Sequence, residues 1–402
     1  MSSKKMQSNL DLYLAILQKY AVAPSFAITA KTLAKHPKLV DNIMKKDVEF
    51  AIHGYQHIDY TRLSDEQLSR HLQKAIKIFR EKNIPFLGFR FPYLRYNNTG
   101  IDILGSLFCW DSSHTILWNI LEKTEFNNRN WRKYQTLLNQ YTCKNSDNSP
   151  SLPRFRSNIL EIPVSLPDDD LLIDRLGIKD EKILFQIWSQ ILKMTYIRGE
   201  LLVLQLHPER ISLYKETLEN LLKTARASEL KIWLTSLNSV YEWWKEKEGF
   251  WADIQEKGND EYEIDAHCSR RATILVKTED SLEHNFFNNY KVINKNKFEI
   301  KSPKVPIIGI PKNCSPTLIQ FFKNEGFIFE ISEDENRYSV FLNDVEVFNE
   351  ENEPKVLEEI KHTQLPLIRF WRWPNGCQSA FAITGDIDAL TSMDFLPRLF
   401  RH

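Results

Sequence analysis

Along residues 1–248, apolar positions alternate between a helical spacing and short continuous runs. Residues 10–20 carry apolar side chains three or four positions apart, which predicts a helix, and Ser64 and Gln67 form a capping box that begins another. The runs that predict strands are 24–29, 48–52, 86–93, 108–110, 159–163, 201–206 and 231–234. Strands that alternate with helices at this spacing predict a parallel α/β sheet or barrel.

The remainder of the chain follows other patterns. Residues 120–158 are polar with little periodicity, which predicts a long excursion with a helix near 131–141. Residues 249–264 are charged and aromatic, and we interpret them as a linker. The short strands and single helix of residues 265–362 predict a small α+β domain, and residues 370–402 form a C-terminal segment with a strand near its middle.

Composition narrows the class of protein. The 402 residues are too many for one ordinary core, and 42% hydrophobic with 26% charged residues is the profile of a soluble globular protein. Lysine plus arginine and aspartate plus glutamate balance at 53 each, so neither a nucleic-acid partner nor an anionic membrane surface is indicated. The polar N-terminus, the absence of a long apolar run and five scattered cysteines predict a cytoplasmic protein with reduced thiols and no transmembrane segment.

Two histidines follow the apolar run 48–52. His53 and His57 stand four residues apart, and on a helix this spacing turns both imidazoles toward one point. Imidazole pairs at this spacing are typical ligands of zinc and similar divalent ions. Polar residues at the carboxyl ends of strands form the active sites of α/β barrels, so the position of the pair also favours chemistry.

Three further motifs stand after predicted strands. Arg90 and Tyr93 belong to an Arg-x-Pro-Tyr motif, His207 closes a Leu-x-Leu-His-Pro motif, and Asp386 and Asp388 form an Asp-x-Asp pair. Paired carboxylates of this kind can divide the roles of metal ligand and general base. The acidic run 168–170 is interpreted differently, as a solvated turn or helix cap.

The set of motifs resembles the NodB-type polysaccharide deacetylases, carbohydrate esterase family 4, over roughly residues 10–245. The His-x-x-x-His, Arg-x-Pro-Tyr and Leu-x-Leu-His-Pro motifs agree with that family in type and order. The segment 111–113, Asp-Ser-Ser, also looks like the family's segment of that kind. The resemblance implies a distorted (β/α)7–8 barrel, with the small α+β domain as an addition to it.

The sequence departs from the family pattern at the Asp motif. The family carries this motif first, on the first strand, whereas here Asp386 and Asp388 come near the end. In one interpretation the chain is a circular permutant, and the strand 381–384 completes the barrel and returns the aspartates to the site. In the other, the chain is a fragment of a tandem protein without a complete site. We favour the circular permutant, because a barrel that lacks one strand has two unpaired strand edges and an unfilled core.

The resemblance implies a role for each residue. His53, His57 and Asp388 are expected to bind a divalent metal ion, most simply Zn²⁺. Asp386 is expected to be the general base, oriented by Arg90. The backbone N–H of Tyr93 is expected to stabilise the oxyanion, and His207 to protonate the leaving amine.

The implied activity is a hydrolase acting on carbon–nitrogen bonds other than peptide bonds. It would remove N-acetyl or O-acetyl groups from a carbohydrate. Two alternatives remain: a non-catalytic carbohydrate-binding relic of the fold, and a metal-dependent hydrolase of a small N-acyl compound or cyclic amide. The sequence does not select the metal, the substrate or an oligomeric state.

Overall fold

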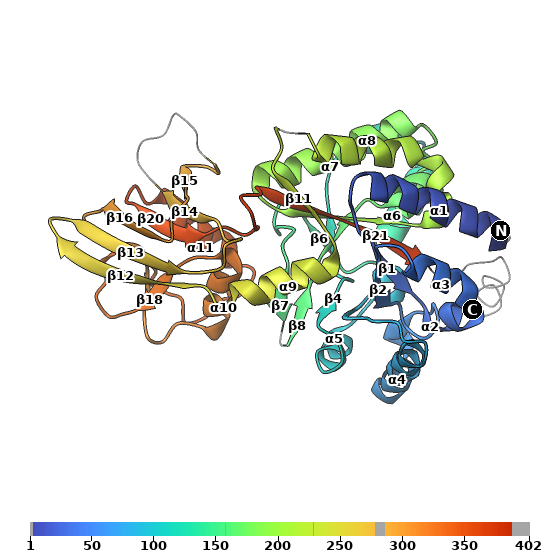
Figure 1. Cartoon of the computed structure of the whole chain (residues 1–402), viewed down its shortest axis with the longest axis horizontal. Coiled ribbons are helices and arrows are strands. Elements are labelled where there is room, and N and C mark those ends of the chain that lie inside the picture. Colours follow the sequence, from blue (N-terminus) through green and yellow to red (C-terminus); the bar gives the residue numbers. More distant parts are fainter. Residues whose placement is uncertain (1–2, 157, 228, 278–285, 388–402) are drawn as a thin grey trace. The chain divides into compact units, whose positions relative to one another are not determined.

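The structure is a computed structural model that describes residues 3–156, 158–227, 229–277 and 286–387. It divides into two compact units (Figure 1). Unit 1 comprises Met1–Tyr241 together with Ala380–His402, and unit 2 comprises Glu242–Ser379. The chain therefore leaves unit 1, builds unit 2 and returns to unit 1.

Within the described residues, unit 1 is built on a 12-stranded sheet. Its strands are β1 (Ser25–Ile28), β2 (Glu49–Ile52), β3 (Gly88–Phe89), β4 (Trp110–Asp111), β5 (Thr115–Leu117), β6 (Cys143–Asn145), β7 (Arg154–Arg156), β8 (Ile159–Glu161), β9 (Val164–Leu166), β10 (Leu201–Leu206), β11 (Ile232–Thr235) and β21 (Ser379–Ile387). The order is β6-β5-β9-β10-β21-β1-β2-β3-β4-β8-β7, and β11 pairs with β21. The central pairs from β9 to β8 are parallel, as the sequence predicts.

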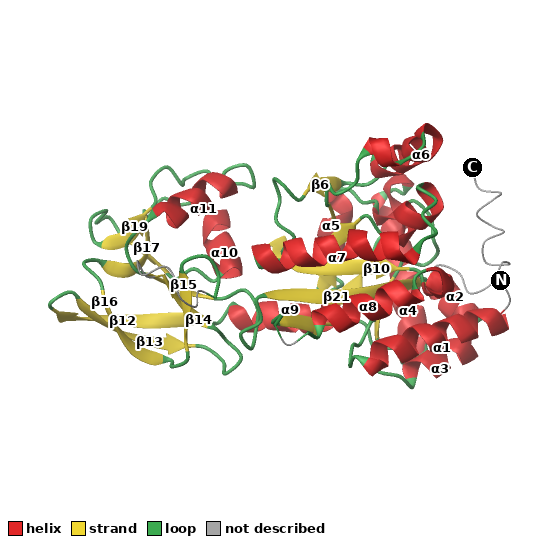
Figure 2. Cartoon of the chain, turned by 90° about the horizontal axis from the view of Figure 1, so that it is seen from above, coloured by secondary structure: helices red, strands yellow, loops and turns green. Residues whose placement is uncertain are grey.

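Helices fill the intervals between these strands. They are α1 (Ser3–Lys19), α2 (Ala30–Lys35), α3 (Pro37–Met44), α4 (Asp65–Glu81), α5 (Asn98–Leu104), α6 (Asn128–Leu138), α7 (Glu181–Arg198), α8 (Lys215–Ala225) and α9 (Leu237–Lys247). The predicted capping box is present, because Ser64 accepts from the Gln67 N–H and the Gln67 side chain accepts from the Ser64 N–H. Figure 2 shows α7 and α8 running along the strands β10 and β21.

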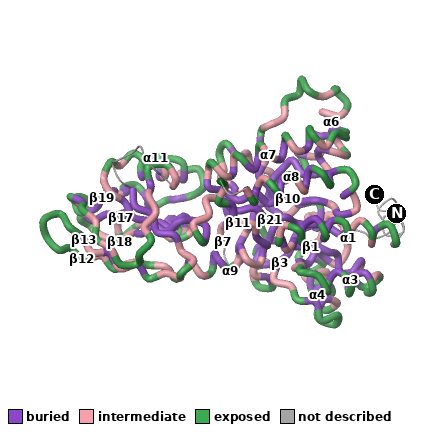
Figure 3. Tube along the Cα trace, turned by 45° about the horizontal axis from the view of Figure 1, so that its top comes forward, coloured by how far each residue is buried: buried purple, intermediate pink, exposed green. Residues whose placement is uncertain are grey.

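The strand β21 lies in the middle of this sheet although it is the last element among the described residues. It pairs in parallel with β10 on one side and with β1 on the other, and Ala27 of β1 stands opposite Asp386 (Figure 1). All nine of its residues are buried, which fits a parallel strand covered on both faces (Figure 3). The predicted strand 381–384 is thus present, and it lies between β1, an early strand of the barrel in sequence, and β10, a late one.

The sheet is curled, and its order ends at β6 and β7 without closing among the described strands. The predicted distorted α/β barrel is confirmed in this half-barrel form. The excursion 120–158 contains α6 and two short strands, β6 and β7, one at each edge of the sheet. Asn130 on α6 donates to the Leu176 carbonyl at 2.7 Å, so the excursion is held against the segment that follows β9.

Unit 2 combines three small sheets with two helices in the part of it that the structure describes. The sheets are β12 (Trp251–Gly258), β13 (Glu261–His267) and β16 (Lys297–Lys301); β14 (Ile274–Lys277), β15 (Tyr290–Ile293) and β20 (Leu367–Phe370); and β17 (Val305–Ile310), β18 (Phe329–Ile331) and β19 (Tyr338–Phe341). The helices are α10 (Pro316–Glu325) and α11 (Glu353–His362). As predicted, Ser315 caps α10 and Gly326 ends it in the left-handed conformation.

The interpretation of residues 249–264 as a linker is wrong. They contain β12 and the first part of β13, which pair as an antiparallel hairpin. Most side chains of β12 are exposed, so the strand lacks the continuous apolar run from which a strand is recognised in sequence. No helix in the described parts of the chain combines the length and the apolar character that crossing a membrane requires.

The packing of β21 against β1 predicts a coupling between Gly385 and Phe26. A Cβ atom at Gly385 would lie 2.5 Å from the Phe26 ring, so Gly385→Ala is expected to destabilise the protein by about 1–3 kcal/mol. Phe26→Leu frees space, and the double variant is expected to lose less stability than the sum of the two single variants. Denaturant unfolding measures all three.

The matched control is Gly105→Ala, because a Cβ atom there meets nothing closer than 3.5 Å. It is expected to change the free energy of unfolding by less than about 1 kcal/mol. Strictly additive losses at Gly385 and Phe26 would contradict the contact between the first and last strands.

Candidate functional site

The polar residues of the motifs meet at one edge of the unit 1 sheet. β2 ends at Ile52, just before His53; β3 ends just before Arg90; and β10 ends just before His207. These strands and β21, which carries Asp386, are parallel neighbours in the order β10-β21-β1-β2-β3. Carboxyl ends of parallel strands open at the same edge, which is where α/β folds hold their active sites.

The histidine pair follows the end of β2, as predicted, and lies on a loop, which is one of the two elements expected at this position; the other was a helix. Gly54 follows His53 with φ +77°, a conformation that disfavours side chains, and a Cβ atom there would collide with the Tyr60 hydroxyl. That hydroxyl accepts the Tyr55 N–H at 2.7 Å and closes the loop. The loop nevertheless brings the rings of His53 and His57 together, with centroids 5.1 Å apart.

The hydrogen bond of His53 defines which ring nitrogen faces the cavity. Its Nδ1 lies 2.9 Å from the Arg90 carbonyl oxygen, which can only accept, so Nδ1 carries the proton. The other nitrogen, Nε2, lies 3.9 Å from Asp386 Oδ2. A histidine that donates through one nitrogen to a backbone carbonyl presents the other in the form that metals bind.

Arg90 is buried and orients Asp386. Its Nη1 donates to Asp386 Oδ1 at 2.6 Å and to the Thr384 hydroxyl at 2.9 Å. Its Nε and Nη2 donate to the carbonyl and the hydroxyl of Ser112, at 2.8 Å and 2.9 Å. Ser112 therefore fixes the guanidinium through two hydrogen bonds, and the guanidinium in turn binds the carboxylate of Asp386 on β21.

The segment Asp111-Ser112-Ser113 supports this arrangement from β4. Ser113 donates its hydroxyl proton to Asp111 at 2.7 Å and accepts the Phe91 N–H at 2.8 Å. Burial raises the pKa of Asp111 to about 8, partly countered by the Ser113 hydrogen bond. This aspartate thus holds the turn that presents Ser112 and is itself fully buried.

His207 forms an ion pair with Asp169. The imidazole Nδ1 donates to Asp169 Oδ1 at 2.7 Å, and the His207 backbone N–H donates to Oδ2 at 2.9 Å. Arg210 adds a contact to the same carboxylate at 3.4 Å. Asp168 and Asp169 are buried, so the interpretation of residues 168–170 as a solvated turn is wrong. The alternative, a helix cap, is confirmed for Asp168, whose Oδ1 accepts the Leu171 N–H at 2.9 Å where a helical segment begins.

The ion pair between His207 and Asp169 shifts the pKa values of its two members in opposite directions. Burial by itself lowers the pKa of His207, but the charge and hydrogen bond of Asp169 outweigh it and hold the pKa well above its ordinary value. Burial likewise raises the pKa of Asp169, and His207 and Arg210 together bring it below its usual range. A protonated His207 beside an ionised Asp169 is the stable form.

Tyr93 stands beside the histidine pair. Its backbone has φ 61° and ψ 10°, unusual for a residue with a side chain, and its ring meets that of His57 edge-on at 4.2 Å. The side chain is 42% exposed, so the residue forms part of the rim. Its predicted role as oxyanion donor stays a prediction.

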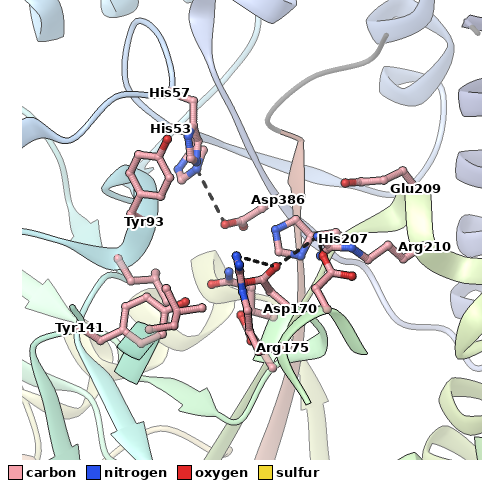
Figure 4. Close-up of a pocket in the computed structure, with 15 residues that line it drawn as sticks. His53, His57, Tyr93, Tyr141, Asp170, Arg175, His207, Glu209, Arg210 and Asp386 are labelled. Carbon is pink, nitrogen blue, oxygen red and sulfur yellow. Dashed lines mark hydrogen bonds and ion pairs between the residues drawn. The ribbon is translucent and has the colours of Figure 1, made fainter. Parts of the chain in front are cut away.

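These residues line one cavity of about 260 Å³ (Figure 4). Of the residues singled out from sequence, His53, His57, Tyr93, His207 and Asp386 line it, and Arg90 bonds Asp386 from behind. Asp388 lies outside the described residues. The cavity is also lined by residues that sequence reasoning missed, among them Tyr141, Asp170, Asp174, Arg175 and Arg210.

Among the described residues, which do not include Asp388, no three His, Cys, Asp or Glu side chains are placed to hold a metal ion, but the chemistry of the expected ligands suits one. Two imidazoles and a carboxylate suit zinc and similar ions, and the proton on Nδ1 of His53 leaves Nε2 in the ligand form. The second carboxylate of the motif, Asp388, is two residues beyond Asp386. The expected ligand set is therefore chemically consistent with the geometry of its described members.

Comparison with known families gives one match. Residues 4–107, about a quarter of the chain, match the family model described as polysaccharide deacetylase. The matched stretch includes His53, His57, Arg90 and Tyr93 and ends before His207 and Asp386. A comparison with curated proteins gave no match.

Several solved structures are weakly similar. One described as a probable polysaccharide deacetylase from Pseudomonas aeruginosa PAO1 has 17% identity, covers 59% of this chain and 72% of that one, and gives a TM-score of 0.46. The PuuE allantoinase gives the same four values. BA3943 of Bacillus anthracis, described as a CE4 family pseudoenzyme, has 14% identity, covers 46% and 57%, and gives 0.27. At these scores, the assignment of the fold comes from the strands and helices themselves.

The ion pair of His207 predicts a shift in its titration. Asp169→Asn removes the negative charge, so the pKa of His207 is expected to fall, as measured by NMR titration of the imidazole. Because the folded-state pKa is raised, the stability that His207 contributes is complete below about pH 6.5 and is lost as pH rises through the folded value. This pH-dependent loss is expected to disappear in the variant.

The matched control is Asp174→Asn, which removes a carboxylate that bonds Arg210 at 2.6 Å and makes no hydrogen bond to His207. It is expected to change the His207 titration much less. Equal shifts in both variants would show that the general negative charge of the cavity, and not Asp169, sets the titration.

Proposed function

We propose that the chain is a metal-dependent deacetylase that hydrolyses acetyl groups of a carbohydrate, N-acetyl groups first of all. The family match supports a hydrolase acting on carbon–nitrogen bonds. The observation that carries the proposal is the pair of ion pairs at one cavity, Arg90 with Asp386 and His207 with Asp169. Hydrolysis of an amide needs a base for the water and an acid for the amine, and these pairs supply both.

We further propose that the barrel is circularly permuted. The place of β21 between β10 and β1, with Asp386 at the cavity, supports the view that the last strand supplies the Asp motif in cis. A fragment without a complete site would instead leave β10 and β1 with unpaired edges.

Asp386 acts as the base. It takes a proton from the attacking water, and Arg90 keeps its carboxylate in one orientation through the bond at 2.6 Å. His53, His57 and Asp388 would hold the metal ion, which when bound polarises the substrate carbonyl and lowers the pKa of water. The Nδ1–H bond of His53 to the Arg90 carbonyl links the ligand group to the residue that orients the base.

His207 acts as the acid. Its Nδ1–H is bonded to Asp169, so as an imidazolium it offers the Nε2 proton to the leaving amine. The backbone N–H of Tyr93 stabilises the developing oxyanion, a contribution of about 3 kcal/mol for one donor. The raised pKa of His207 keeps its proton available at neutral pH.

The proposal is tested by metal content and acetate release from N-acetylated oligosaccharides, with O-acetylated sugars as a second substrate. Asp388→Ala is expected to lose both metal and activity. Asp386→Asn is expected to keep the metal and lose about 10²–10⁴-fold in kcat, because it lacks a base. His207→Ala is expected to keep the metal and lose activity toward amides.

The control is His362→Ala, an exposed histidine on α11 whose side chain is 74% accessible. It is expected to change neither readout. Full metal and activity in Asp388→Ala would place the site elsewhere, and a wild-type protein that binds sugar without releasing acetate would favour the non-catalytic alternative.

A further inference from the structure

The cavity has a wall that no family motif contributes. Leu137 and Tyr141 come from the excursion 120–158 and line the cavity together with Asp170, Asp174 and Arg175 from the segment after β9. Asn130 ties α6 to that segment through the Leu176 carbonyl at 2.7 Å. Figure 4 shows the Tyr141 ring beside Asp170 and Arg175.

The wall limits the size of what enters. Pockets for drug-sized ligands span about 300–1,000 Å³, and this cavity holds about 260 Å³. Its lining comes from β2, β3, β10 and β21 on one side and from the excursion and the acidic segment on the other. A space of this size takes about one sugar ring with its acyl group.

Arg210 also lines the cavity, and with it the two aspartates of the wall face two arginines. Arg175 bonds Asp170 at 3.0 Å and 3.1 Å, and Arg210 bonds Asp174 at 2.6 Å and Asp170 at 3.3 Å. Each of these charged side chains therefore pairs with an opposite charge in the lining of the cavity. Pairs of this kind offer hydrogen bonds to hydroxyl groups and no net attraction for a charged ligand.

We propose that the cavity accepts a single neutral N-acylated sugar ring, free or at the end of a chain, and that Tyr141 is a specificity-determining residue that packs on that ring. This inference rests on the proposed function and names its substrate class. Rings such as that of Tyr141 supply a large apolar face with a polar edge, which suits a pyranose whose faces are apolar and whose rim carries hydroxyls. A cavity of about 260 Å³ takes about one ring, so a sugar at the end of a chain is expected to enter it more readily than an internal one.

The test compares N-acetyl-D-glucosamine, its short oligomers and a long polymer as substrates. Wild type is expected to act on the single sugar and on terminal residues, as shown by mass spectrometry of the products. Tyr141→Ala is expected to raise KM for the single sugar about tenfold, because the ring contact is lost, and to raise KM for ethyl acetate, an acyl ester without a ring, much less. Tyr141→Phe is expected to restore KM, because the ring is kept.

Gln135→Ala, an exposed position on α6, is the matched control and is expected to resemble wild type. Deacetylation of internal residues as fast as terminal ones, or an unchanged KM in Tyr141→Ala, overturns the inference. If wild type hydrolyses neither sugar nor ethyl acetate, the proposed function fails. Calorimetry of N-acetyl-D-glucosamine binding to wild type and Tyr141→Ala then decides the inference, with equal affinities overturning it.

Discussion

The buried ion pair between Arg90 and Asp386 joins residues 296 positions apart and fixes the arrangement around it. Both side chains are almost fully buried, at 1% and 4% exposure. Two charges withdrawn from water need hydrogen bonds to compensate, and Ser112 and Thr384 accept from three of the four guanidinium N–H groups that Asp386 does not use. Loss of one partner would leave the other charge buried alone.

This pair requires that β21 be in the sheet. Asp386 reaches Arg90 because β21 runs parallel to β1, in the register that sets Ala27 opposite Asp386. A slip of one residue would turn the carboxylate to the other face of the sheet and bury an apolar side chain against the guanidinium. The carbonyl of Arg90 also accepts the hydrogen bond of His53 Nδ1–H. The register of β21 therefore determines the ion pair, and through Arg90 the ion pair also positions His53.

Local patterns predicted the strands that precede the motif residues, because a buried parallel strand contains a continuous apolar run, as Leu201–Leu204 of β10 and Ala380–Ile383 of β21 do. They did not predict Asp169. An acidic run in a sequence resembles a solvated turn. The carboxylate of Asp169 is stable when buried because it binds His207 and Arg210, which lie after α7 in the chain. Tyr141 was missed for a similar reason, since the polar excursion that carries it has no periodicity to mark a wall. The loop of His53 and His57 shows that spacing alone does not select a helix.

The two ion pairs also explain how one cavity can hold an acid and a base at once. Arg90 places a positively charged guanidinium against the carboxylate of Asp386 at 2.6 Å. Asp169 gives His207 a negative neighbour that burial shields from water, and this keeps the imidazole protonated. Environments that separate two titratable groups in this way assign base and acid without reference to any family. The proposed assignment depends on the pairing of β21 in the sheet, because without β21 Asp386, the proposed base, would be absent and Arg90 would lose the carboxylate that it binds.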